Sequence, residues 1–215
     1  AAGAAAGMDF ALGSVGAGAG ATAGPLAGGL GSASAVDPVS GLTVGALVAA
    51  NPRGGTVIPG TDTLWAWALE VDGEFGGQPV PAGPMAPDAD PLPLPAADPA
   101  LRDRLAGAGE TEGANTTLAV VATDAVLSRV EALRLAIMAQ DGLAMAIHPA
   151  HTPFDGDTVF ALSTGRRALP EPRPAHLARL GALAARCLAR AIGRGIVEAT
   201  GRPDAPAYRD RRRRR

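Results

Sequence analysis

A proline-dense segment near the middle of the chain limits how the chain can fold. Eight prolines lie between positions 79 and 99. Proline fixes φ and lacks the backbone N–H, so neither a helix nor a central strand persists at that density. We therefore expect residues 76–100 to form an extended surface linker, followed by a short helix over residues 100–108.

The stretch after this linker, residues 113–124, is a glycine-led polar turn that leads directly into an apolar strand. Its junction reads Asn115-Thr116-Thr117. A Thr hydroxyl can attack the carbonyl that precedes it, and a Thr that becomes a chain terminus carries its own general base, the α-amine. That amine has an ordinary pKa of about 7.7–8.0. A simpler interpretation is a polar loop that enters a β-strand.

The composition favours a single domain whose core is built from small side chains. Hydrophobic residues make up 47% of the 215 residues and aromatic residues only 3%. The single cysteine, Cys187, excludes an internal disulfide framework, is expected to be buried, and fits a reducing, cytoplasmic compartment. No apolar run reaches the length of about 18 residues that a membrane span needs, and residues 1–7 lack the positive start of a signal peptide.

The charges are distributed unevenly along the chain. The formal net charge is −2, yet residues 209–215 hold six arginines and one aspartate. The acidic remainder argues against a nucleic-acid-binding domain. We expect the Arg-rich tail to be a disordered, solvated end, although contact with nucleic acid or anionic lipid is the alternative.

The glycine-rich residues 13–24 have the spacing of a nucleotide-binding loop but not its context. No clear strand precedes them and no acidic residue follows at the distance that a ribose contact requires. A close crossing of backbones is the better expectation. Elsewhere the hydrophobic pattern predicts strands at residues 42–51, 118–123 and 158–163, and helices at 128–146 and 174–199.

These elements predict an α/β (α+β) fold, a mixed sheet with helices packed on it. The helix expected over residues 128–146 is amphipathic. Its predicted apolar face consists of Val130, Leu133, Ile137 and Leu143.

Polar residues next to the predicted strands are candidates for a site. Asp155 and Asp157 precede a strand at i and i+2, so both should point to one side, where mutual repulsion raises one pKa and lets the pair pass a proton. A plain Asp-Gly turn is the alternative. Asn51 either caps a turn or points its amide into a site. His148 and His151 could suggest a metal pair, but their proline-broken loop favours contacts with backbone groups, so no metal is expected.

Six stretches of the chain match, in order, the pattern of one known family: residues 15–22, 43–48, 115–124, 141–144, 151–165 and 208–210. Taken together they resemble the self-processing DmpA family, which includes L-aminopeptidase/D-esterases, β-peptidyl aminopeptidases and nylon-oligomer hydrolases. The resemblance implies a layered αββα fold of the N-terminal-nucleophile type, here without the N-terminal portion that the family carries. It also implies that residues 1–115 end a larger subunit and that residues 116–215 form a smaller one.

The resemblance also implies residue roles. The cut falls between Asn115 and Thr116, and Thr116 is the nucleophile. Asp155 and Asp157 support it, and the amide of Asn51 holds the oxyanion. The expected substrates are short peptides, β-peptides or amino-acid amides, hydrolysed without a metal or organic cofactor by a homotetramer of processed protomers that binds neither nucleic acid nor membrane.

One departure from the family pattern lies at Ala27, where the family usually places a Lys. A non-catalytic homologue with only a structural role is therefore the second hypothesis. A third is an anion- or nucleotide-binding module built on the glycine-rich residues 13–24.

Overall fold

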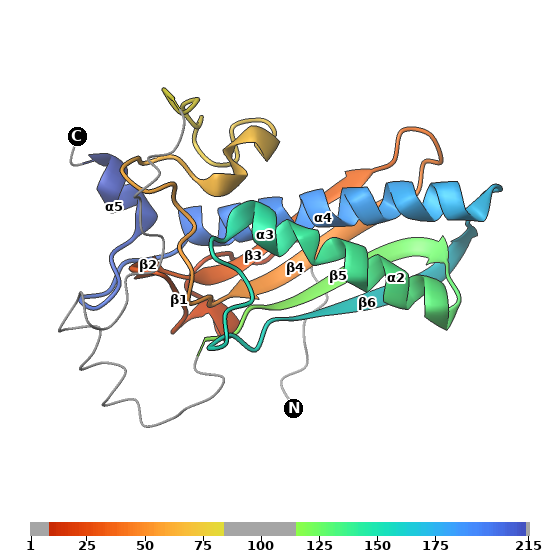
Figure 1. The fold of residues 1–215 in the computed structure, drawn as a ribbon, viewed down its shortest axis with the longest axis horizontal. Helices are drawn as coiled ribbons and strands as arrows, with labels where there is room; N and C mark the ends of the chain where they lie inside the picture. The colour runs from red at the N-terminus through yellow and green to blue at the C-terminus, as the bar shows by residue number, and fades with distance from the viewer. Residues whose placement is uncertain (1–8, 84–114, 214–215) are drawn as a thin grey trace.

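A four-stranded mixed sheet lies at the centre of the molecule (Figure 1). The computed structural model describes residues 9–83 and 115–213. In the strand order β3–β4–β5–β6 the first two pairs are antiparallel and the last is parallel, which confirms the expected mixed sheet. The sheet strands are β3 (Gly29–Val36), β4 (Thr43–Ala50), β5 (Leu118–Val126) and β6 (Thr158–Ala168), and a separate hairpin pairs β1 (Thr22–Ala23) with β2 (Leu26–Ala27).

Helices cover one face of this sheet (Figure 1). The longest, α4, runs along the sheet, and α2 and α3 form the crossover between the parallel strands β5 and β6. None of the described helices is long and apolar enough to cross a membrane. The helices are α2 (Arg129–Ala139), α3 (Asp141–Ala146), α4 (Arg173–Val197) and α5 (Tyr208–Arg213), with 3-10 turns η1 (Gly16–Gly18) and η2 (Trp65–Leu69).

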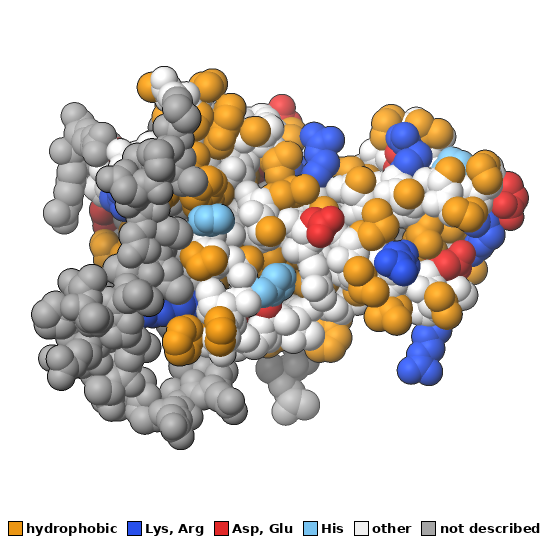
Figure 2. Space-filling view, viewed as in Figure 1, with side chains coloured by type: hydrophobic (Ala, Val, Ile, Leu, Met, Phe, Trp, Pro, Cys, Tyr) orange, Lys and Arg blue, Asp and Glu red, His pale blue; other side chains and the backbone are white. Residues whose placement is uncertain are grey.

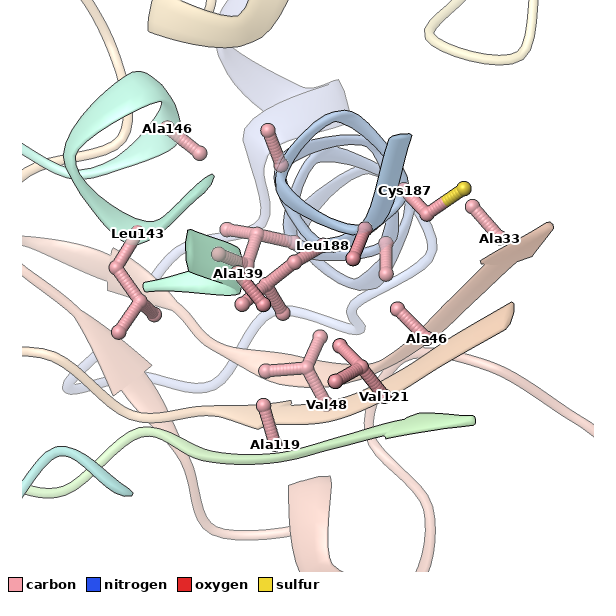
Figure 3. Packing of buried hydrophobic residues seen from close by; sticks show 14 of the residues in the cluster. Ala33, Ala46, Val48, Ala119, Val121, Ala139, Leu143, Ala146, Cys187 and Leu188 are labelled. Carbon is pink, nitrogen blue, oxygen red and sulfur yellow. The ribbon is translucent and has the colours of Figure 1, made fainter. Parts of the chain in front are cut away.

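The core lies between the sheet and α4. Strand side chains alternate between the two faces, and in Figure 3 Val48 and Val121 point from the sheet towards Leu188 of α4. Small residues allow α4 to approach the sheet backbone closely, because a Cβ on Gly31 would lie only 1.8 Å from the carbonyl oxygen of Ala191. A Cβ on Gly18 would likewise lie 2.3 Å from the nitrogen of Leu30, which confirms the close crossing expected for the glycine-rich segment.

The helix predicted over residues 128–146 is two helices, and its predicted apolar face is wrong. The chain breaks at Gln140 between α2 and α3. Of the predicted face only Leu143 is buried, and apolar side chains gather on the outer side of α2 (Figure 2). This helix carries apolar residues on two faces, and packing against α4 selects the one that is buried. The exposed residues are Val130, Leu133 and Ile137, and the buried ones are Leu135, Ala136 and Ala139.

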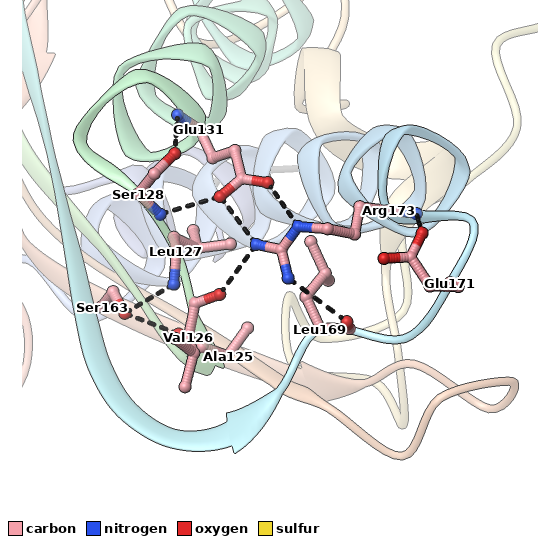
Figure 4. A network of polar contacts seen from close by, with 9 residues as sticks. All are labelled: Ala125, Val126, Leu127, Ser128, Glu131, Ser163, Leu169, Glu171 and Arg173. Carbon is pink, nitrogen blue, oxygen red and sulfur yellow. Dashed lines mark hydrogen bonds and ion pairs between the residues drawn. The ribbon is translucent and has the colours of Figure 1, made fainter.

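A charged network fixes the start of α2 against the start of α4 (Figure 4). Ser128 and Glu131 form a capping box at the N-terminus of α2. Arg173 donates two hydrogen bonds to the Glu131 carboxylate, at 3.0 and 2.8 Å. These bonds lower the pKa of Glu131 to about 2.

The prediction that the Arg-rich tail is a disordered end is wrong for residues 209–213. They belong to α5, which begins at the buried Tyr208, and the Tyr208 hydroxyl donates to the carbonyl oxygen of Asp62 at 2.6 Å. Arg209 pairs with Glu198, and Arg211 pairs with Asp62 at 3.2 Å. Opposite charges elsewhere in the fold therefore pair with Arg209 and Arg211. Most of the proline-rich linker and the helix predicted over residues 100–108 lie outside the described residues.

Candidate active site

The parallel pairing of β5 and β6 brings the two most informative stretches of the sequence together. Parallel neighbours start at the same edge of a sheet, so residues 115–117 before β5 lie beside residues 155–157 before β6. Asn115 and Asp155 form a parallel bridge. The N–H of Thr158 donates to the carbonyl oxygen of Thr117 at 3.0 Å. The proposed cut and the acidic pair are therefore side by side.

Asp157 fixes the backbone directly after Thr116. Its Oδ1 accepts a hydrogen bond from the N–H of Thr117 at 2.9 Å. Its Oδ2 lies 3.3 Å from the backbone nitrogen of His151 and 3.1 Å from Nδ1 of the same residue. The Asp157 side chain is only 1% exposed. A buried carboxylate with several N–H partners is a rigid anchor.

Asp155, which precedes Gly156, links the loop after β4 to the loop before β6. Its Oδ1 accepts from the N–H of Arg53, which follows β4, at 2.8 Å. Its Oδ2 accepts from both the N–H and the hydroxyl of Thr152, at 3.0 and 2.6 Å. Asp155 thus also closes a local turn, so the simple turn interpretation describes part of its role.

Asn51 also meets Thr116, through its backbone. Its carbonyl oxygen accepts from the N–H of Thr116 at 2.9 Å. Its side-chain Oδ1 accepts from the N–H of Thr22 at 2.9 Å, which orients the amide. All four residues that the sequence placed in one site, Asn51, Thr116, Asp155 and Asp157, are therefore joined through direct contacts or short chains of hydrogen bonds.

Gly156 is a site residue that the sequence interpretation did not single out. Its N–H donates to the carbonyl oxygen of Asn115 at 3.0 Å, at the bond proposed to break. A Cβ at this position would lie 2.8 Å from Oγ1 of Thr116. The Asp-Gly-Asp pattern was a signal, but a glycine between two aspartates is also what an ordinary turn contains.

The two adjacent threonines differ in their surroundings. Thr117 is fully buried, and within the described part of the chain its hydroxyl has no hydrogen-bond partner. Thr116 is half-buried and lies against Gly156. The geometry therefore favours Thr116 over Thr117 as the reactive residue.

The two candidate histidines contact an aromatic ring and a carboxylate, and the cysteine lies in the hydrophobic core. The ring of His148 packs on Trp65 at a centroid distance of 5.0 Å. His151 contacts Asp157, as described above. Across residues 9–83 and 115–213 no group of three or more His, Cys, Asp or Glu side chains is arranged to hold a metal ion. Cys187 is buried as expected, and burial raises the pKa of its thiol to about 11.

Ala27, which stands where the resemblance implies a Lys, is fully buried. It packs with Ala199 and Ala205 in a small cluster. Its N–H donates to the carbonyl oxygen of Pro206 at 3.0 Å. In this chain the position is part of the packing between β2 and the segment that follows α4.

Several known proteins resemble this chain in sequence. An uncharacterised aminopeptidase of Mycobacterium bovis is 44% identical over 216 residues, which cover 96% of this chain and 58% of that protein. One of Mycobacterium leprae is 39% identical over 211 residues, covering 92% of this chain and 52% of that protein. The 6-aminohexanoate-oligomer endohydrolase of Paenarthrobacter ureafaciens is 38% identical over 60 residues, covering 28% of this chain and 17% of the enzyme.

Solved structures show the same fold. A Pyrococcus horikoshii protein superposes with a TM-score of 0.60 at 25% identity, covering 95% of this chain and 52% of that one. The L-aminopeptidase D-Ala-esterase/amidase of Ochrobactrum anthropi, described as a variant of the Ntn-hydrolase fold, gives a TM-score of 0.57 at 24% identity, over 92% of this chain and 48% of that one. These neighbours confirm the expected fold class.

The chain therefore spans little more than half the length of its mycobacterial relatives. The family description "Peptidase family S58" matches residues 1–205, which is nearly the whole chain. The chain belongs to peptidase family S58.

Proposed function

We propose that this chain carries the reactive part of a self-cleaving amide hydrolase in which Thr116 is the nucleophile. The single observation that carries the proposal is the position of Thr116 between Asn51 and Gly156. Its backbone N–H donates to the Asn51 carbonyl oxygen, and its hydroxyl lies beside the Gly156 backbone. Membership of a peptidase family supports the same class of reaction.

Self-cleavage begins when Oγ1 of Thr116 attacks the carbonyl carbon of Asn115. The new C–O bond gives a tetrahedral intermediate with negative charge on the Asn115 oxygen. This intermediate collapses as the C–N bond between the two residues breaks, and the nitrogen takes up the proton that the hydroxyl loses. Water then hydrolyses the resulting ester. Asn115 ends in a carboxylate, and Thr116 becomes an N-terminus with a free α-amine.

Hydrolysis of a substrate uses the same hydroxyl. The α-amine of Thr116 remains beside the carbonyl oxygen of Asn51 and acts as the general base for Oγ1. Thr116 takes the acyl group and releases an amine, and water then releases the acid. Asp155 and Asp157 hold the surrounding backbone, and the Asn51 amide is proposed to donate to the oxyanion.

The proposed substrates are short peptides, β-peptides and amino-acid amides. The aminopeptidase names of the mycobacterial relatives and the oligomer endohydrolase support this class. Activity without a metal or organic cofactor, assembly into a tetramer and a cytoplasmic location remain predictions.

The test is intact-mass analysis of the purified chain after overnight incubation, with hydrolysis of amino-acid amides measured in parallel. We expect two fragments that meet between Asn115 and Thr116. Thr116→Ala should abolish both cutting and hydrolysis, whereas Thr116→Ser, which keeps a hydroxyl, should retain both. Cleavage at this bond in the Thr116→Ala variant would overturn the assignment.

A non-catalytic role is the second candidate, and the burial of Ala27 among other alanines favours it. A chain that stays intact at 21.3 kDa but shows a cooperative circular-dichroism melt would support this candidate over the enzyme.

A further inference from the structure

We propose that the backbone N–H of Gly156 is an oxyanion donor, first for the Asn115 carbonyl in self-cleavage and then for the acyl carbonyl of the substrate. The inference rests on the proposed function and assigns a further catalytic group to it. The nitrogen of Gly156 lies 3.0 Å from the oxygen of Asn115 before any bond is broken.

The hydrogen bond is aimed where negative charge develops. When Oγ1 of Thr116 adds to the Asn115 carbonyl carbon, the π electrons of that carbonyl move onto its oxygen. A donor already in place stabilises this charge without reorganisation during the reaction. The same donor also polarises the carbonyl before the attack.

Anchors on both sides of Gly156 hold its N–H in place. Asp155 is fixed by the N–H of Arg53 and by Thr152. Asp157 is fixed by the N–H of Thr117. The two carboxylates therefore act, through the backbone, as positioning residues for the donor between them, in addition to any direct effect on Thr116.

The absence of a side chain at position 156 is the second requirement. A Cβ there would approach Oγ1 of Thr116 to 2.8 Å, which is closer than real Cβ contacts come. Any other residue would push the hydroxyl away from the carbonyl that it must attack. Glycine thus brings an N–H to the oxygen and leaves room for the nucleophile.

This placement also locates the substrate. After self-cleavage the Asn115 carboxylate can leave, and the N–H of Gly156 becomes available to another carbonyl. The residue that gives its acyl group to Thr116 then occupies the position that Asn115 holds in the uncut chain. The inferred ligand class is an amide whose carbonyl is presented from the same side as that of Asn115.

The direct test replaces Gly156 by glycolic acid in the full chain, which exchanges the N–H for an oxygen and changes no side chain. Loss of one oxyanion donor should slow cutting at Asn115–Thr116 by about 10²–10³-fold. The matched control is Gly41→glycolic acid, which removes the hydrogen bond from Gly41 to the Asp37 carbonyl oxygen, 2.7 Å long, in the turn between β3 and β4. Circular-dichroism melts compare the folding of the two variants.

The control should melt like the Gly156 variant and cut at the wild-type rate. Equal cutting rates in both ester variants would overturn the proposal and leave the role of Thr116 intact. Continued cutting in Thr116→Ala would instead show that the proposed function itself is wrong. Cleavage of the introduced ester is recognised by mass, because that bond lies before position 156.

A second variant tests the space that glycine provides. Gly156→Ala keeps the N–H but crowds Oγ1 of Thr116, so kcat for amide hydrolysis should fall more than KM changes. Gly20→Ala is its control, because a Cβ there has no heavy atom of the described chain within 4 Å. Wild-type kcat in Gly156→Ala would refute the steric part of the inference.

Discussion

Replacing Asp157 by Asn tests whether the buried carboxylate positions Thr116 or only stabilises the fold. The amide has one acceptor oxygen where the carboxylate has two. Either the Thr117 N–H or the His151 N–H, which Asp157 now accepts at 2.9 and 3.3 Å, therefore loses its partner. A hydrogen bond to a charged group contributes about 1.5–3 kcal/mol.

We expect the free energy of unfolding to fall by about that amount in Asp157→Asn. If the bond to Thr117 also keeps Thr116 aligned for attack, its loss should raise the activation barrier of self-cleavage by a similar amount. Because about 1.4 kcal/mol corresponds to a factor of ten in rate, self-cleavage should slow by about 10- to 100-fold.

The assay combines a denaturant melt with a time course of intact mass. Asp204→Asn is the control, because that side chain is 73% exposed and its loss should change neither quantity. A destabilised Asp157→Asn variant that still cuts at the wild-type rate would show that Asp157 supports only the fold, and would refute the positioning role.

Two further variants test features outside the reacting groups. Thr117→Val replaces a fully buried hydroxyl that has no hydrogen-bond partner among the described residues. The free energy of unfolding, measured in a denaturant melt, should therefore rise by about 1 kcal/mol, and cutting at Thr116 should continue. A loss of stability would contradict this reasoning. Glu131→Gln removes a carboxylate whose pKa Arg173 lowers from 4.5 to about 2, so the wild type should melt higher than this variant near neutral pH. The difference in melting temperature should shrink as the pH falls from 4.5 towards 2. The Glu131 carboxylate stabilises the fold fully above its pKa in the unfolded state, and this stabilisation is lost as the pH falls through its pKa in the folded state. A difference in melting temperature that does not depend on pH would contradict this reasoning.

Local patterns in the sequence were enough to predict much of the fold. The structure contains the strand predicted over residues 42–51, which ends one residue earlier at Ala50, the strand beginning at Leu118 and the long C-terminal helix. These elements are continuous apolar or amphipathic runs, so their type depends mainly on neighbouring residues. The family resemblance and the two polar stretches before β5 and β6 also identified the residues of the candidate site.

Other features depended on contacts between distant parts of the chain. The buried face of α2 depends on its packing against α4, and the positions of Arg209 and Arg211 depend on Glu198 and Asp62. No short-range pattern contains those partners.

The role inferred for Gly156 also depends on a contact between distant parts of the chain. Its N–H meets the Asn115 carbonyl only because β5 and β6 pair in parallel and in one register. The sequence alone predicts the element types and which residues carry reactive groups, since both follow from local chemistry. The tertiary structure decides which backbone groups face those residues, because strand register is set by pairing across 40 residues of chain, as between Thr117 and Asp157.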